Sequence, residues 1–254
     1  VMTVGFTLLP VPVSLDIRGW TEMHPLNGPA WSLFFEYIAN ILYAVLIRKF
    51  TSRWLAVLVF LAACALIHQC YTQGNNIGGW TLDVEQCRVG LTRLMFPFFG
   101  GLLLFRLCKP GRVRHGFWWC SLLLVGALAM PHVGGAENFH LNGLYDAFCI
   151  IVIFPAVVFL GASDIPGDIS SRASRFLGNI SYPLYITHYP IVYLYLAWVH
   201  DAEVPFSRAL PVAVGVLFIC IAVAYGCLKL YDEPVRAWLS KRVLARRAPE
   251  QPRP

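Results

Sequence analysis

One acidic residue, Glu36, lies inside a long apolar run of this 254-residue chain, among Leu33, Phe35 and Ile38. If the helix begins near Pro29, Glu36 lies about 10 Å from that start, which is past the headgroups of a bilayer. An intramembrane carboxylate is costly and marks a functional site by default, as a general base or a proton carrier. The structural alternative is an acid that a neighbouring hydroxyl or carbonyl satisfies and that only holds helices together.

Other polar side chains lie before and after Glu36 in the same run, and steps of four, four and three residues separate the four of them. This spacing places them on one face of a helix. Such a face must meet protein or water and not lipid, so it predicts a polar surface inside a membrane bundle. The stripe consists of Ser32, Glu36, Asn40 and Tyr43.

A second polar stripe lies in the run from 176 to 199, where Ser181, Tyr185 and His188 are spaced i, i+4 and i+7. If this helix enters the membrane near Phe176, His188 lies about 18 Å along it, at a depth similar to that of Glu36. We therefore predict that Glu36 and His188 line one cavity and share a proton. The alternative is that separate hydrogen bonds satisfy each of them.

Several further charges have two interpretations each. Arg93 and Asp146 lie near the outer ends of their runs. Each could be a partner for Glu36 or a charge at the membrane interface. Arg172 and Arg175, together with the loop from 106 to 114, could bind the phosphates of a cytoplasmic cofactor or could simply set the orientation of the chain. No metal-ligand spacing, nucleotide-binding loop or nucleophile elbow is present in the sequence.

The composition predicts the elements that must position these residues. Hydrophobic residues make up 57% of the chain and charged residues only 13%, which is typical of a polytopic membrane protein. We expect an all-α transmembrane helical bundle with about seven complete spans and a partial one at 1–10. The complete spans are expected at about 30–47, 54–71, 90–107, 117–133, 143–161, 176–199 and 209–230.

Basic residues predict the orientation, because they are retained on the cytoplasmic side of span ends. Most of the 20 basic residues fall near 48–53, 106–114 and 172–175 and in the tail after 229. Segments 11–29, 72–89, 134–142 and 200–208 are therefore expected outside, and the C-terminus inside. Positive-inside retention and anionic lipid account for the net charge of +6 without a nucleic-acid partner.

The chain starts abruptly in apolar sequence at Val1–Pro10, which indicates the end of a span whose beginning is missing. We expect one membrane domain over 1–241, incomplete at its N-terminus. A basic, disordered cytoplasmic tail is expected over 242–254, where prolines recur. Cys70 and Cys87 could share an exterior loop and form a disulfide.

Three segments resemble the acyltransferase type 3 family of integral-membrane acyltransferases, which includes bacterial polysaccharide and O-antigen O-acetyltransferases. The first is LNGPAWSLFFEYIANILYA, with Trp31, Ser32, Leu33 and Glu36 in the pattern Trp-Ser-Leu-x-x-Glu. The second is FLGNISYPLYITHYPI, with Ser181, Tyr182, Pro183, Leu184, Tyr185 and His188. The third, YDEPVRAWL, holds Glu233, Pro234 and Arg236 and is weak alone.

The resemblance implies a larger helical bundle, of which this chain would be the later part, in a bacterial cytoplasmic membrane. It implies transfer of an acyl group, acetyl above all, from cytoplasmic acyl-CoA to a hydroxyl of an extracytoplasmic carbohydrate or lipid-linked glycan. The expected partners are that acceptor and membrane lipid, with no metal and no nucleic acid. The oligomeric state stays open.

The resemblance also implies roles for particular residues. The catalytic residues would be Glu36 and His188, which would orient or relay for a further histidine. That histidine lies in the first span of the family, after a basic residue, and has no counterpart here, so the activity of this chain by itself is left open. His24 lies in an outside loop and does not take the role.

The implied substrate-binding residues are Trp31, Ser32, Asn40, Arg93, Ser181, Tyr182 and Tyr185, and Arg172 and Arg175 would bind acyl-CoA. Two other functions also fit the residues. A proton-coupled transporter could use Glu36 and His188 as its pathway, although no two-fold repeat of broken segments is visible. A noncatalytic membrane component is the third possibility.

Overall fold

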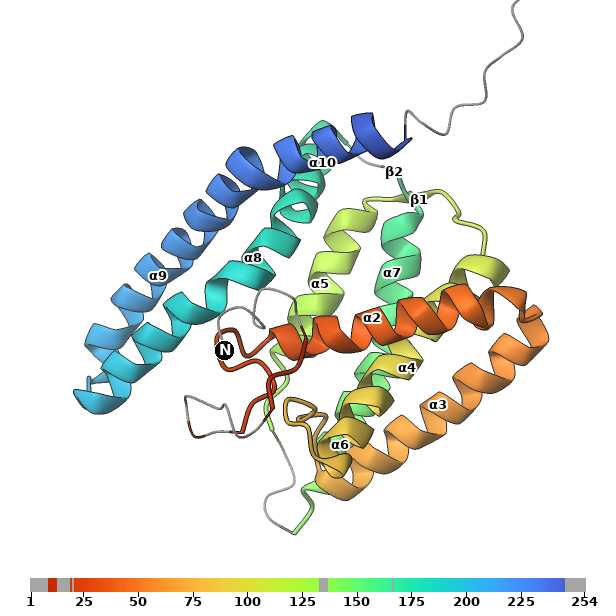
Figure 1. The fold of residues 1–254 in the computed structure, drawn as a ribbon, viewed down its shortest axis with the longest axis horizontal. Helices are drawn as coiled ribbons and strands as arrows, with labels where there is room; N and C mark the ends of the chain where they lie inside the picture. The colour runs from red at the N-terminus through yellow and green to blue at the C-terminus, as the bar shows by residue number, and fades with distance from the viewer. Residues whose placement is uncertain (1–8, 13–18, 20, 133–136, 166, 245–254) are drawn as a thin grey trace, which may run out of the picture. The chain divides into compact units, whose positions relative to one another are not determined.

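The computed structural model describes residues 9–12, 19, 21–132, 137–165 and 167–244. The chain is mostly helical and divides into two compact units, Val1–Arg172 and Ala173–Pro254 (Figure 1). The first unit contains α2 (Ala30–Val45), α3 (Ser52–Gln73), α4 (Val84–Leu107), α5 (Gly116–Leu128), α6 (His140–Phe148) and α7 (Phe154–Ala162). The helix α8 (Asp168–Asp201) begins in the first unit and continues into the second.

Local residue chemistry sets the ends of α3 and α4. Thr51 caps α3 by accepting a bond from the Trp54 amide at 3.4 Å, and Gly74 ends it in the left-handed conformation, φ 71°. Asp83 caps α4 by accepting from the Gln86 amide at 2.9 Å. The Thr81 hydroxyl also donates to Asp83, and these bonds hold the pKa of its carboxyl below the ordinary value, so the cap stays charged.

The core of the first unit lies between α3, α4 and α6. Leu66, Cys70 and Phe96 are buried there with Ala147, and all four belong to one cluster. At Gly143 the backbone of α6 meets α3 so closely that a Cβ would overlap the carbonyl oxygen of Cys70. Glycine at this position therefore sets how near the two helices can approach.

A short parallel pair of strands ties the two ends of the α5–α7 region together. Strand β1 (Val113–Arg114) pairs with β2 (Asp164–Ile165), and the Val113 amide donates to the Ser163 carbonyl at 2.8 Å. The buried Ser163 hydroxyl accepts from the Gly111 amide at 2.9 Å, and Asp164 accepts from the Gly116 amide at 2.7 Å. The loop before α5 is thus held by its own backbone amides, which donate to one carbonyl and to the side chains of Ser163 and Asp164.

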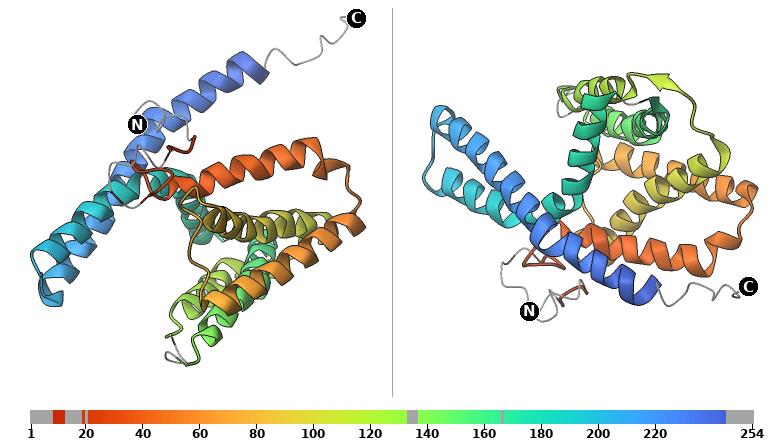
Figure 2. Two further views of the ribbon diagram at one scale, coloured as in Figure 1. Left: turned by 60° about the horizontal axis from the view of Figure 1, so that its bottom comes forward. Right: turned by 90° about the horizontal axis from the view of Figure 1, so that it is seen from above.

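The second unit is a hairpin of α8 and α9 (Phe206–Cys227), which lie side by side in both views of Figure 2. The Tyr195 hydroxyl donates to the Ala209 carbonyl at 3.1 Å, and the rings of Phe176 and Tyr225 are 6.3 Å apart. After α9 the chain stays helical through α10 (Glu233–Leu239) to Leu244. Residues 245–254 of the predicted tail, and residues 1–8 of the predicted partial span, lie outside the described residues.

Two wide π-type turns precede prolines in the apolar helices. One is η3 (Cys149–Ile153) before Pro155, and the other is η4 (Leu228–Asp232) before Pro234. Proline has no amide to donate, and its ring clashes with the carbonyl four residues earlier in a regular helix. The wider turn makes room for that ring, so each helix continues through its proline.

Four helices in the described part of the chain are long and apolar enough to cross a membrane. They are Ser52–Gln73, Val84–Leu107, His140–Ala162 and Phe206–Arg242. Although a helix overlaps each of the seven predicted ranges, α2 and α5 have only 16 and 13 residues. The 34-residue α8 is long, but its tyrosines, prolines and histidine lower its hydropathy. The predicted count of seven complete spans is therefore not confirmed.

Cys70 and Cys87, which the sequence left as a possible disulfide pair, are both free thiols. Cys70 is buried inside α3, where it packs in the core, while Cys87 belongs to the first turn of α4. The Cys87 thiol lies 3.9 Å from the Thr81 carbonyl.

Candidate functional site

The polar stripe on α2 runs beside the residues that pack into the first unit, and it is partly buried at Ser32. Ala30, Leu33 and Ala39 are buried, whereas Glu36 and Asn40 are exposed. The Asn40 side-chain amide donates to the Glu36 backbone carbonyl at 2.8 Å, on the same helix. This contact leaves the Glu36 carboxylate on the exposed face of an apolar helix.

Trp31 and Arg93 meet between α2 and α4, as two of the predicted substrate-binding residues. The Arg93 guanidinium lies over the Trp31 ring, 4.7 Å from its centroid, and donates to the Gly78 carbonyl. Arg93 therefore contacts an aromatic face and a loop backbone, and Asp146, its counterpart in the prediction, accepts the Asn76 amide at 3.0 Å. Both charges hold the loop between α3 and α4.

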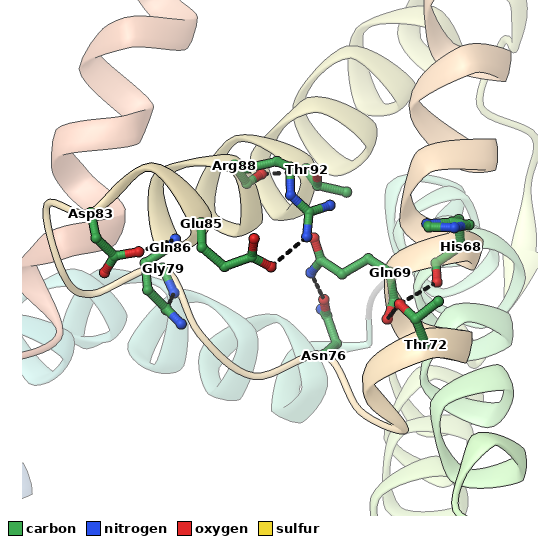
Figure 3. A network of polar contacts seen from close by, with 10 residues as sticks. All are labelled: His68, Gln69, Thr72, Asn76, Gly79, Asp83, Glu85, Gln86, Arg88 and Thr92. Carbon is green, nitrogen blue, oxygen red and sulfur yellow. Dashed lines mark hydrogen bonds and ion pairs between the residues drawn. The ribbon is translucent and has the colours of Figure 1, made fainter.

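That loop approaches the two helices closely because it contains adjacent glycines with positive φ. Gly79 has φ 103°, and a Cβ there would lie 2.9 Å both from Trp31 and from the Cα of Gly90. Its amide donates to the Gln86 side chain at 2.6 Å, beside the Asp83 cap (Figure 3). The segment before α2 joins this cluster through the Met23 amide, which donates to the Trp80 carbonyl at 2.8 Å.

The second stripe lies on α8, which remains one continuous helix through Pro183 and Pro190. The Ser181 hydroxyl lies 2.9 Å from the Gly178 carbonyl, and the rings of Tyr185 and His188 are 6.2 Å apart. Nδ1 of His188 lies 2.9 Å from the Leu184 carbonyl and 3.0 Å from that of Tyr185.

The contacts of His188 determine how its neutral imidazole is protonated. Because both neighbours of Nδ1 are carbonyl oxygens, Nδ1 must be the donor, and Nε2 then carries the lone pair. Nε2 is thus the atom that can accept a proton. Glu36 belongs to the first unit and His188 to the second, so their predicted pairing stays a prediction.

The predicted cofactor-binding arginines are helical. Arg172 and Arg175 are exposed three residues apart in the first two turns of α8, whereas the sequence placed them in a loop. Arg112 and Arg114 are exposed on the segment held by β1 and β2. The sequence did not predict the pairing of β1 with β2, because strands of two residues have no periodic pattern of hydrophobic residues.

Sequence reasoning missed a buried polar group at the end of α3. Gln69 is only 1% exposed, and its amide nitrogen lies 3.5 Å from Asn76 Oδ1 (Figure 3). His24, assigned to an outside loop, is also buried, with its ring 6.5 Å from that of Phe34. The sequence signal that could have identified Gln69 was the presence of a glutamine within the apolar run 54–71.

A mostly helical fold with four apolar helices of membrane length defines a membrane protein. The chain belongs to the acyltransferase type 3 family, since a family model described as an acyltransferase domain matches residues 1–228. The comparisons with curated proteins and with solved structures gave no match. The family consists of acyl-transferring membrane enzymes, and this is the class to which the protein belongs.

The matched range includes both polar stripes, so the resemblance drawn from the Trp31–Glu36 and Ser181–His188 segments is confirmed. The weak ending with Glu233 and Arg236 lies beyond the match. Those two side chains form ion pairs within their own helix, Glu233 with Lys229 at 2.6 Å and Arg236 with Asp232.

Proposed function

We propose that the protein transfers an acyl group, acetyl above all, from cytoplasmic acyl-CoA to a hydroxyl of an extracytoplasmic carbohydrate or lipid-linked glycan. The family supplies the reaction class. The observation that carries the proposal is Glu36, an acid on the exposed face of an apolar helix, with Ser32 and Asn40 beside it. In a bilayer such a face meets water, substrate or protein, because lipid cannot solvate it.

The donor would bind on the cytoplasmic side and the acceptor on the outer side of a bacterial cytoplasmic membrane, with the C-terminus inside. Arg172 and Arg175 would hold its phosphates, with Arg112 and Arg114 in support, since guanidinium groups bind phosphate oxygens in a fork geometry. All four side chains are exposed, which fits a soluble nucleotide donor.

In the reaction, Glu36 or Nε2 of His188 accepts the proton of the acceptor hydroxyl, directly or as a relay. The hydroxyl oxygen bonds to the acyl carbonyl carbon, the carbon–sulfur bond of the thioester breaks, and the proton passes to the CoA sulfur. Ser32, Tyr182 and Tyr185 donate hydrogen bonds to the acceptor or to the oxyanion that forms at the carbonyl.

The remaining residues of the proposed acceptor site orient the carbohydrate. The Trp31 ring offers a flat apolar surface, and Arg93, which lies over it, fixes the position of that ring. Asn40 and Ser181 follow the two stripes and provide polar atoms along each.

The test measures transfer of labelled acetyl from acetyl-CoA to a polysaccharide fraction by membranes containing the full-length protein. Glu36→Gln and His188→Ala are each expected to reduce the rate by about 10²- to 10⁴-fold, the range for loss of a general base. The matched controls are Glu137→Gln, in a loop, and His200→Ala, at the far end of α8. Both controls should retain full activity at equal expression.

Full acetylation by both site variants would remove Glu36 and His188 from the mechanism. Proton-dependent solute flux in liposomes, with no acetyl transfer by the wild-type protein, would instead favour a transporter and would contradict the proposed reaction.

A further inference from the structure

An apolar groove of about 690 Å³ runs between α3 and α4, and none of its lining residues belongs to either polar stripe. The side chains that line it are mostly aliphatic, and several are well exposed: Val84 is 88% exposed and Leu61 is 59% exposed. The principal wall residues are Leu58, Leu61, Ala62, Val84, Leu91 and Met95.

One end of the groove carries a pair of opposite charges. Arg88 lines the groove and lies 2.6 Å from Glu85, one turn earlier on α4 (Figure 3). The two side chains are 51% and 63% exposed, so both charges are open to a ligand. Exposed ion pairs are weak, which lets a ligand with matching charges enter between them.

The wall that α4 gives the groove is about as long as one lipid leaflet is thick. From Val84 to Met95, α4 rises about 16 Å, and half the hydrocarbon core of a bilayer is about 15 Å. The whole helix is about 36 Å long, so Arg88, about 6 Å from its start, falls near the headgroup boundary when the helix spans the core. The apolar walls then extend from that boundary to the bilayer centre.

We propose that this groove binds one glycerophospholipid with a zwitterionic headgroup. The phosphate contacts Arg88, the ammonium contacts Glu85, and one acyl chain fills the space between α3 and α4. A headgroup with only a negative charge would meet Arg88 but would also lie against the Glu85 carboxylate. The paired charges thus select phosphatidylethanolamine over phosphatidylglycerol.

The test is native mass spectrometry of the purified protein in mild detergent, with equal amounts of the two phospholipids added. Leu61→Trp places an indole in the groove and is expected to abolish the bound-lipid peak. Leu122→Trp is the matched control, because Leu122 is 62% exposed on α5 and lies outside the groove. It should retain the lipid.

The headgroup variants test selectivity without filling the groove. Glu85→Gln is expected to lower the preference for phosphatidylethanolamine over phosphatidylglycerol about threefold, the effect of one exposed charge contact. Arg88→Gln should weaken binding of both lipids by a similar factor.

Three results would overturn the proposal. The first is equal retention of lipid by Leu61→Trp and the wild-type protein. The second is a wild-type protein that binds both phospholipids equally, which would mean that the charge pair does not distinguish their headgroups. The third is a dimer peak that Leu61→Trp removes, since a second copy would then occupy the groove.

Discussion

At the scale of single residues, three polar side chains of the two stripes bond to carbonyls of their own helix. Asn40 contacts the Glu36 carbonyl, Ser181 that of Gly178, and His188 that of Leu184. Such contacts satisfy a donor in an apolar environment without a neighbouring helix. Replacing Asn40 or His188 therefore tests function without removing a contact between helices.

The contact between Trp31 and Arg93 is expected to stabilise the fold measurably. In a double-mutant cycle with Trp31→Leu and Arg93→Gln, we expect a coupling of about 0.5–1 kcal/mol, the strength of a cation–π contact. Chemical unfolding of the protein in detergent gives the four stabilities. Arg88→Gln is the control, because Arg88 pairs with Glu85 and should show additivity with Trp31→Leu. Equal coupling in both cycles would contradict the specific contact.

At the scale of the elements, the closest approach between helices is at Gly143. Gly143→Ala is expected to destabilise the protein by about 1–3 kcal/mol, because its methyl group would force α6 away from the Cys70 carbonyl. Thermal unfolding in detergent measures the change.

The control for this substitution is Gly126→Ala in α5, where a Cβ meets open space. It removes a glycine from a helix without a clash and should be neutral or stabilising, by up to about 1 kcal/mol. If both variants lost stability equally, the cause would be the loss of glycine itself and not the approach of α6 to α3.

Hydropathy was sufficient to locate the helices, because a chain in a bilayer must bury its backbone polar groups within helices. Element ends were harder to predict. The third predicted span began at 90, but α4 begins at Val84, because Asp83 caps a helix whose first two turns contain Glu85 and Arg88. Those charges lower the hydropathy of the first turns of α4, and the start of the span was predicted from hydropathy.

The polar faces of α2 and α8 could be predicted from spacing, since side-chain direction in a helix follows from periodicity alone. The contact of Arg93 with Trp31 could not, because it depends on the loop conformation at Gly78 and Gly79. Burial of His24 likewise depends on how an irregular segment folds back, for which no periodic signal exists.

At the scale of the whole molecule, the distribution of basic residues predicts opposite sides for two loops. In a background without native cysteines, Ile77→Cys should react with a membrane-impermeant maleimide in intact cells, since Ile77 is 62% exposed between α3 and α4. Arg112→Cys should react only after permeabilisation. The reverse pattern would invert the orientation and place the proposed donor site on the wrong side.

The pairing of β1 with β2 bears on how the loop before α5 meets an anion. The Val113 amide donates to the Ser163 carbonyl, and the Gly111 and Gly116 amides donate to the side chains of Ser163 and Asp164; these bonds order the loop when the protein folds. The conformational entropy of Arg112 and Arg114 backbones is thus already lost before any ligand arrives. If the proposed acyl-CoA donor places its phosphates there, its affinity would not be reduced by the ordering of a flexible loop.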